Sequence, residues 1–152
     1  MPGAGKTSVG TALAQLLQWG FVDTDDLVGD PASIIERDGI DAFRAREREV
    51  IAAVQPRDRV VAVGGGAVLD PANRAVLSSL GPIVWLRADA GTLTAHLAGD
   101  DRDRPLLHDH GALRYLLAER TPIYADFADV VVDVDGLDPN QVAVEVVKAL
   151  AA

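Results

Sequence analysis

The sequence predicts an α/β fold in which a central parallel sheet is flanked by helices. Short runs of β-branched and other apolar residues alternate with longer segments whose apolar residues recur at helical spacing. The short runs are apolar throughout, which is typical of parallel strands covered on both faces. The 152 residues are 49% hydrophobic and contain no repeat or linker, so we expect a single domain over residues 1–152.

The first half of the chain supplies helices and two strands. Val9, Leu13 and Leu16 lie on one face of a helix, and a helical pattern further on is broken at Gly39. The apolar runs between these segments are too short for helices, and one of them ends in three glycines. In order, we expect a helix, a strand, a broken helical region and a buried strand over residues 6–18, 20–23, 33–54 and 59–63.

The second half continues the alternation. Pro71 suits the first turn of a helix, and Asp89 is a candidate N-cap. We expect helices over residues 71–80, 89–97, 112–120 and 139–151, and strands over 82–86 and 130–133. Residues 99–111 are polar, charged and irregular, which indicates a mobile loop.

Composition excludes several classes of function. The formal net charge is −9, which disfavours a broad nucleic-acid-binding face. Cysteine is absent, so disulfides and thiolate metal sites are excluded. No membrane span or signal peptide is expected, and we predict a cytoplasmic protein. An anionic small molecule could bind only where arginines and backbone N–H groups are concentrated in one cleft.

A phosphate-binding loop opens the chain. Gly3, Gly5, Lys6 and Thr7 match the end of the pattern G-x-x-x-x-G-K-[ST] and run directly into a helix. The glycines let backbone N–H groups face a phosphate, Lys6 can reach the β- and γ-phosphates, and the Thr7 hydroxyl can ligate Mg²⁺. The expected ATP contacts in this segment are Gly3, Ala4, Gly5, Lys6, Thr7 and Ser8. The alternative is a glycine-rich helix cap with an incidental lysine.

The first glycine of this pattern and the strand that delivers the loop would both stand before Met1. We therefore expect residues 1–152 to be an incomplete protein. An apolar, β-branched extension ending in glycine is expected to complete the middle of the sheet and to raise stability and ATP affinity together.

Five further motifs follow the phosphate loop in a fixed order. They are Asp23-Thr24-Asp25, Phe43-Arg44 with Glu47, Gly64-Gly65-Gly66-Ala67, Arg104-Pro105-Leu106-Leu107 and Arg120-Thr121-Pro122-Ile123-Tyr124. Together with the loop, this series resembles the shikimate kinase family across nearly the whole chain. The resemblance implies a three-layer P-loop kinase fold, a substrate-binding helical region over about 26–54 and a mobile lid over about 99–111. It also implies a monomer that phosphorylates the 3-hydroxyl of shikimate in aromatic amino acid (chorismate) biosynthesis.

For the reacting groups, the resemblance implies that Lys6, Asp25 and Arg104 are catalytic. Asp25 would contact the reacting hydroxyl, and Arg104 would stabilise charge on the transferring phosphoryl group. Thr7 and Asp23 would hold Mg²⁺, with ATP as co-substrate. Asp133 and Pro139 would bound the loop that contacts adenine. The alternatives are that Asp25 or Asp26 caps a helix and that Arg104 lies in a solvated charged loop.

For shikimate itself, the resemblance implies that Arg44 and Arg120 bind the carboxylate, since a guanidinium fork matches it with two hydrogen bonds. Glu47 would hold Arg44 in place. Asp25 and the backbone of Gly64, Gly65 and Gly66 would complete the substrate site. The alternatives are a solvated helix face at Arg44 and a simple glycine turn. Tyr124 and Pro122 are expected to pack and to shape a turn.

Two other functions stay open at this point. A related kinase, such as a gluconate kinase, is disfavoured by the glycine triplet together with two arginines. A catalytically weak nucleotide-binding relative is the other. Three departures from the family pattern support it: the P-loop is truncated, the segment between Asp25 and Phe43 is short, and residues 95–97 lack an arginine.

Overall fold

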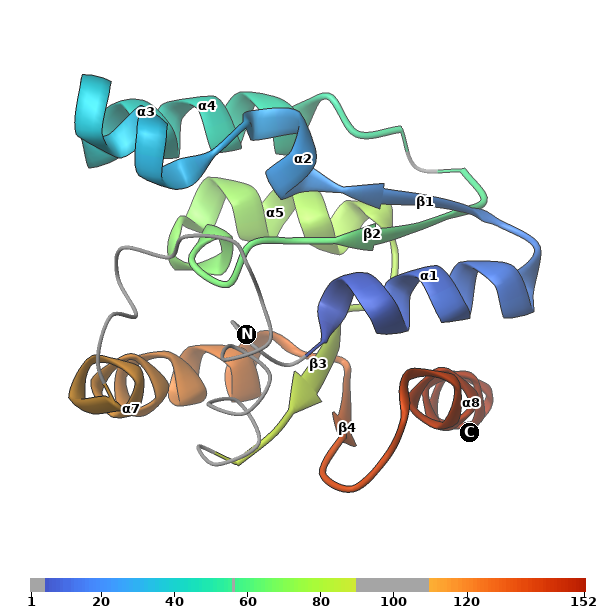
Figure 1. Ribbon diagram of the computed structural model, residues 1–152. Helices are drawn as coiled ribbons and strands as arrows, with labels where there is room; N and C mark the ends of the chain where they lie inside the picture. Colours follow the sequence, from blue (N-terminus) through green and yellow to red (C-terminus); the bar gives the residue numbers. More distant parts are fainter. Residues whose placement is uncertain (1–4, 56, 90–109) are drawn as a thin grey trace.

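Two pairs of parallel strands lie at the centre of the molecule in the computed structural model (Figure 1). β1 pairs with β2, and β3 pairs with β4, both in parallel. The strands run over Gly20–Asp23, Arg59–Ala62, Val84–Arg87 and Val130–Asp133. The structure describes residues 5–55, 57–89 and 110–152. Parallel strands flanked by helices confirm the predicted α/β class.

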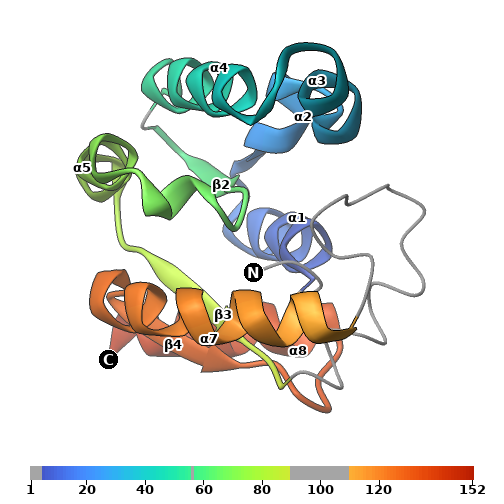
Figure 2. The same ribbon diagram turned by 90° about the vertical axis from the view of Figure 1, so that its left-hand side faces the viewer.

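Helices cover both strand pairs. Figures 1 and 2 show α3 and α4 together beyond β1 and β2, and α7 and α8 beside β3 and β4. The helices are α1 (Lys6–Leu17), α2 (Thr24–Val28), α3 (Pro31–Asp38), α4 (Ile40–Ala52), α5 (Pro71–Leu80), α7 (His110–Phe127) and α8 (Pro139–Ala151), with a short 3-10 helix, η1 (Ala67–Leu69). Among the described helices, none is long and apolar enough to cross a membrane.

The described strands form two two-stranded sheets, where the sequence predicts one central sheet. Within the described residues, β2 and β3 each have one edge without a strand partner. The strand that the sequence analysis expects ahead of Gly3 stays a prediction. Helix α1 connects the two pairs, because it packs against both β2 and α8.

Short sequence signals set where the helices begin. Asp30, Asp70 and Asp138 each accept a backbone N–H bond at a helix N-terminus, and each is followed by proline. Asp138 also forms a capping box with Gln141. Such caps satisfy N–H groups that have no partner inside the helix. The predicted start of the helix at Pro71 is therefore confirmed.

The sequence predictions differ from the structure at two helices. Helix α7 continues past Pro122 to Phe127, whereas the prediction ended at Arg120 and placed Pro122 and Tyr124 in a turn. Proline removes one backbone hydrogen bond and favours a helix end, but here the helix continues through it. Helix α2 was not expected as a separate element. The predicted helix at 89–97 and the loop at 99–111 fall largely outside the described residues.

Two apolar clusters hold the fold together. The larger contains Val9 and Leu13 of α1 with Val142 and Val146 of α8, and it also includes Trp85 of β3. A smaller, separate cluster lies among α2, α3 and α4 and consists of Val28, Ile34 and Phe43. Residues 24–52 thus have a small core of their own, beside the edge where β1 and β2 end.

Candidate functional site

The N-terminus of α1 forms the phosphate side of the site. Gly5 has φ 78°, a left-handed conformation that a residue with a side chain rarely adopts. Lys6 and Thr7 follow in the first turn, where the helix N-terminus favours an anion. Ser8 is exposed. Gly3 and Ala4 lie outside the described residues.

Two aspartates meet this helix end from β1 and α2. The Thr7 hydroxyl donates to Asp23 Oδ2 at 2.9 Å, and Asp23 Oδ1 accepts from the Asp25 N–H at 3.0 Å. Asp23 is therefore the N-cap of α2, where the sequence analysis had considered Asp25 or Asp26 for a cap. A hydroxyl and a carboxylate in contact, close to a phosphate-binding helix end, are donors that suit Mg²⁺. Among the described residues, no group of three or more His, Cys, Asp or Glu side chains could hold a metal, so Mg²⁺ would depend on water and phosphate oxygens for its other ligands.

Helix α4 contributes an arginine held by a buried glutamate. Arg44 Nη1 donates to Glu47 Oε1 at 2.9 Å, and Glu47 is only 1% exposed. Burial raises the pKa of Glu47; the Arg44 charge opposes this rise and the Asp25 charge adds to it. This geometry contradicts the alternative of a solvated helix face, because one partner of the pair is fully enclosed.

The glycine triplet (residues 64–66) follows β2 and touches both acidic and basic members of the site. A Cβ on Gly64 would lie 2.8 Å from Asp25 Oδ1 and 3.1 Å from Glu47 Oε2. A Cβ on Gly66 would lie 2.6 Å from Arg44 Nη1. The absence of side chains thus lets the strand end approach the functional groups closely.

Helix α7 brings the second arginine to the same cluster, beside Glu47 and Tyr124. Arg120 is 6% exposed, and its Nε has no hydrogen-bond partner among the described residues. One turn later, the Tyr124 hydroxyl donates to the Gly65 carbonyl oxygen at 2.6 Å. Arg120 also acts electrostatically on both Glu47 and Tyr124, so it lies close to this cluster. A buried guanidinium with an unpaired N–H is a group that a bound anion would satisfy.

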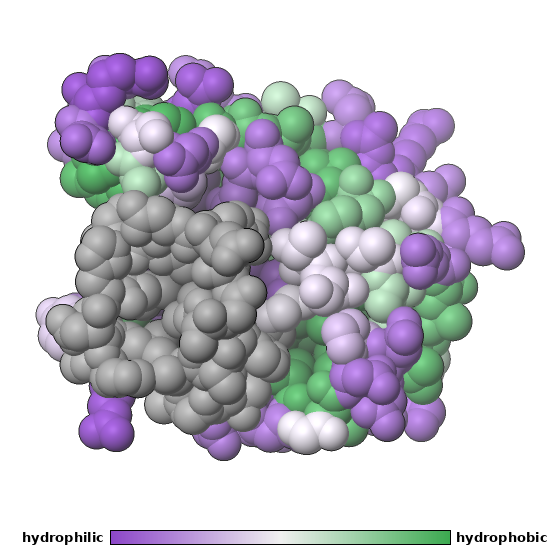
Figure 3. Space-filling model, viewed as in Figure 1, coloured by the Kyte–Doolittle hydropathy of each residue, from purple (hydrophilic) through white to green (hydrophobic). Residues whose placement is uncertain are grey.

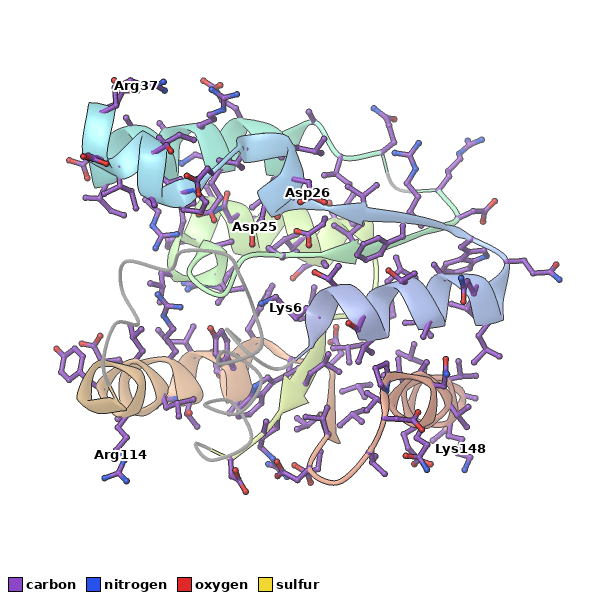
Figure 4. All side chains as sticks on the ribbon, viewed as in Figure 1. Lys6, Asp25, Asp26, Arg37, Arg114 and Lys148 are labelled. Carbon is purple, nitrogen blue, oxygen red and sulfur yellow. The ribbon has the colours of Figure 1, made fainter. Side chains whose placement is uncertain are left out.

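The structure therefore gathers most of the predicted site residues. They are Thr7, Asp23, Asp25, Arg44, Glu47, Gly64, Gly65, Gly66 and Arg120. Figure 4 shows Lys6 at the start of α1 and Asp25 on α2, whereas Arg37, Arg114 and Lys148 point outward. In Figure 3, hydrophilic residues lie along the outer edge of the region of α3 and α4, with hydrophobic residues between them.

The two residues predicted to bound the adenine loop follow the other strand pair. Asp133 and Pro139 bound the loop between β4 and α8, on the other sheet. Asp133 accepts two bonds from Arg87, at 2.5 and 2.9 Å, and the Arg87 hydrogen bonds lower the pKa of Asp133. Arg104 falls outside the described residues.

Sequence reasoning missed two contacts that fasten the triplet and the turn after it. One is the bond from Tyr124 to Gly65, and the other is the bond from Asn73 Nδ2 to the Ala67 carbonyl oxygen at 3.0 Å. Asn73 is buried inside a helix, which is unusual for a polar residue, but this burial is seen only in the structure. The Tyr124 contact joins residues 59 positions apart and has no local signal.

Comparison with known proteins identifies relatives of this chain. The sequence model of the shikimate kinase family matches residues 2–151. The shikimate kinase of Francisella tularensis subsp. novicida is 41% identical over 146 residues, which cover 88% of this chain and 81% of the relative. The structure of shikimate kinase from Acinetobacter baumannii in complex with shikimate superposes with a TM-score of 0.90 at 30% identity, covering 99% of this chain and 89% of that one. Shikimate kinase from Bacteroides thetaiotaomicron has a TM-score of 0.83 at 26% identity, covering 98% and 93%.

Proposed function

The chain belongs to the shikimate kinase family and its activity is the ATP-dependent phosphorylation of shikimate; we propose that the cluster around the glycine triplet is its shikimate site. One observation carries the proposal. Two arginines from different helices belong to one cluster: Arg44 lies against Gly66, and Arg120 lies beside Tyr124, which donates to Gly65. The buried Arg120 Nε has no hydrogen-bond partner among the described residues.

The arginines would bind the carboxylate of shikimate. Glu47 holds the Arg44 guanidinium in one orientation before substrate arrives, which lowers the entropy that binding must remove. The unpaired N–H of Arg120 is oriented by α7. Guanidinium groups form charge-assisted, paired bonds with a carboxylate that an ammonium group cannot reproduce.

Asp25 would act on the reacting hydroxyl. Its Oδ1 lies against Gly64, next to the buried Glu47 carboxylate. A carboxylate in this position can orient the 3-hydroxyl of shikimate and accept its proton as the new bond to phosphorus forms. The Asp25 backbone is fixed by Asp23, so this carboxylate is placed by the same residue that contacts Thr7.

The nucleotide would lie at the start of α1. Gly5, Lys6, Thr7 and Ser8 would contact the phosphates, and Thr7 with Asp23 would hold Mg²⁺. When bound, Mg²⁺ offsets charge on the phosphate oxygens. We extend the proposal to Gly3, Ala4 and Arg104, which lie outside the described residues, and to Asp133 and Pro139 as bounds of the adenine loop. From the family we also propose a cytoplasmic monomer.

Coupled ADP release tests the function, with shikimate, with gluconate and without an acceptor. We expect turnover to require shikimate and Mg²⁺. Asp25→Asn is expected to lower turnover by about 10²- to 10⁴-fold, the usual contribution of a positioned proton acceptor. Asp26→Asn, at the next and exposed position, is the matched control and is expected to retain activity. No turnover with shikimate, or equal rates with gluconate, would reject the proposal.

A further inference from the structure

The Tyr124 hydroxyl joins helix α7 to the glycine triplet. It donates to the Gly65 carbonyl oxygen at 2.6 Å across 59 positions of sequence. Tyr124 is 7% exposed, and its ring packs against Trp85 with centroids 5.7 Å apart. The buried ring therefore fixes the position of the hydroxyl, which donates a hydrogen bond to a backbone oxygen of the site.

Gly65 lies between two glycines that touch the substrate-binding side chains. Gly64 lies against Asp25 and Glu47, and Gly66 lies against the Arg44 guanidinium. A run of three glycines has little conformational preference of its own. Its orientation must come from neighbouring groups, and the bond to the Gly65 carbonyl fixes the peptide unit in the middle of the run.

Tyr124 also lies next to the second arginine. Arg120 precedes it by four residues on α7, so both side chains lie on one face of the helix. Burial raises the pKa of the Tyr124 hydroxyl, and the adjacent Arg120 charge opposes that rise. One hydroxyl thus contacts the backbone of the triplet and faces the guanidinium expected to bind carboxylate.

We propose that Tyr124 is a positioning residue for shikimate, which holds the glycine triplet and Arg120 in a fixed relation without touching the substrate. The proposal rests on the shikimate site described above. It distinguishes Tyr124 from a residue that only fills the core, because its effect should appear in shikimate affinity and be absent from ATP affinity.

Tyr124→Phe removes the hydroxyl and keeps the ring against Trp85. Tyr115→Phe is the matched control, since Tyr115 lies on the same helix and is 64% exposed. The measurements are kcat, KM for shikimate and for ATP, melting temperature, and hydrogen exchange of the Ala67 and Leu69 amides. These amides donate to Gly64 and Gly66 and so report on the triplet.

For Tyr124→Phe we expect KM for shikimate to rise about three- to tenfold, the usual effect of one neutral hydrogen bond. KM for ATP should be unchanged, and both amides should exchange faster. Tyr115→Phe should match the unaltered protein in each measurement.

Unchanged shikimate KM, or unchanged amide exchange, in Tyr124→Phe would overturn the proposal. Equal rises in both Michaelis constants with a lower melting temperature would also overturn it, since they indicate a general structural role. If the unaltered protein itself does not phosphorylate shikimate, the proposed function fails and the positioning role fails with it. An active unaltered protein with an unaffected Tyr124→Phe variant rejects the positioning role alone.

Discussion

At the scale of single residues, the site depends on two buried charged groups, Glu47, which is paired with Arg44, and Arg120, whose Nε has no hydrogen-bond partner among the described residues. Glu47 is almost fully enclosed and holds Arg44, and Arg120 is nearly as buried. Burying a charge costs free energy unless the charge is paired, so a buried charged residue rarely leaves the stability of a core unchanged. In a chain of net charge −9, these two arginines supply the local positive charge that an anionic substrate needs.

The carboxylate role of Arg120 is tested by Arg120→Lys. A lysine keeps the charge but cannot form the paired bonds of a guanidinium. A lost charge-assisted bond costs about 1.5–3 kcal/mol, so KM for shikimate should rise about 10- to 150-fold while KM for ATP barely changes. Steady-state kinetics with each substrate varied in turn gives both values.

Arg114→Lys is the control for this substitution, because Arg114 is an exposed arginine on the same helix that points outward (Figure 4). It should leave both Michaelis constants unchanged. An Arg120→Lys protein with normal shikimate affinity would remove Arg120 from the site.

The raised pKa of Glu47 predicts a pH dependence. Burial places the pKa of folded Glu47 above its ordinary value of 4.5, so the folded state takes up a proton more readily than the unfolded chain. The contribution to stability is fully present below pH 4.5 and is lost as pH rises through the folded pKa. Below that pKa, however, protonated Glu47 no longer offers Arg44 a charged partner, and shikimate affinity should fall.

Glu47→Gln cannot ionise and separates these effects from those of other groups. Compared with the variant, the unaltered protein should lose more unfolding free energy between pH 4.5 and neutral pH. It should also show an extra loss of shikimate affinity in acid. Urea unfolding and shikimate KM at a series of pH values measure both, and parallel pH profiles for the two proteins would contradict the assignment.

At the scale of elements, the glycine triplet leaves room for neighbouring side chains because it has no side chains of its own. Gly66 has φ −88° and ψ −9°, a conformation open to any residue, so no backbone strain requires glycine there. What requires it is the Arg44 guanidinium, which occupies the position of a side chain. The Arg44 guanidinium therefore keeps its present place beside the strand end only because Gly66 lacks a Cβ.

Gly66→Ala tests this fit. The new methyl group should displace the Arg44 guanidinium from its place beside Glu47 and raise KM for shikimate by about tenfold, through loss of a charge-assisted contact. Gly20→Ala in β1 is the control, because its Cβ would meet nothing closer than 3.7 Å. Kinetics of both variants decide the matter, and normal shikimate affinity in Gly66→Ala would show that Arg44 does not need this position.

Elements with local signals were predictable, and those set by distant contacts were not. The strand at residues 20–23 and the helix at 71–80 were predicted with the bounds observed, because apolar pattern and capping agree there. The end of α7 was missed since Pro122 is a strong local signal that tertiary packing overrides, with Tyr124 buried against Trp85. The site residues were predicted from motif order, but their mutual contacts depend on the fold.

At the scale of the whole molecule, function depends on bringing four elements to one point. Helix α1 delivers the phosphate-binding end, α4 delivers Arg44, α7 delivers Arg120, and the end of β2 delivers the triplet between them. The larger apolar cluster joins α1, α7 and α8 to both strand pairs, so the core also sets the distances within the site. No local sequence pattern encodes that convergence.

The central claim is that this convergence forms a site for the carboxylate of shikimate, and titration calorimetry tests it most directly. Shikimate and its methyl ester differ in the charge that Arg44 and Arg120 are expected to bind. We predict that shikimate binds and that the ester binds at least about tenfold more weakly, as expected for loss of a charge-assisted contact. Equal affinity for the two compounds, or no binding of shikimate, would contradict the account.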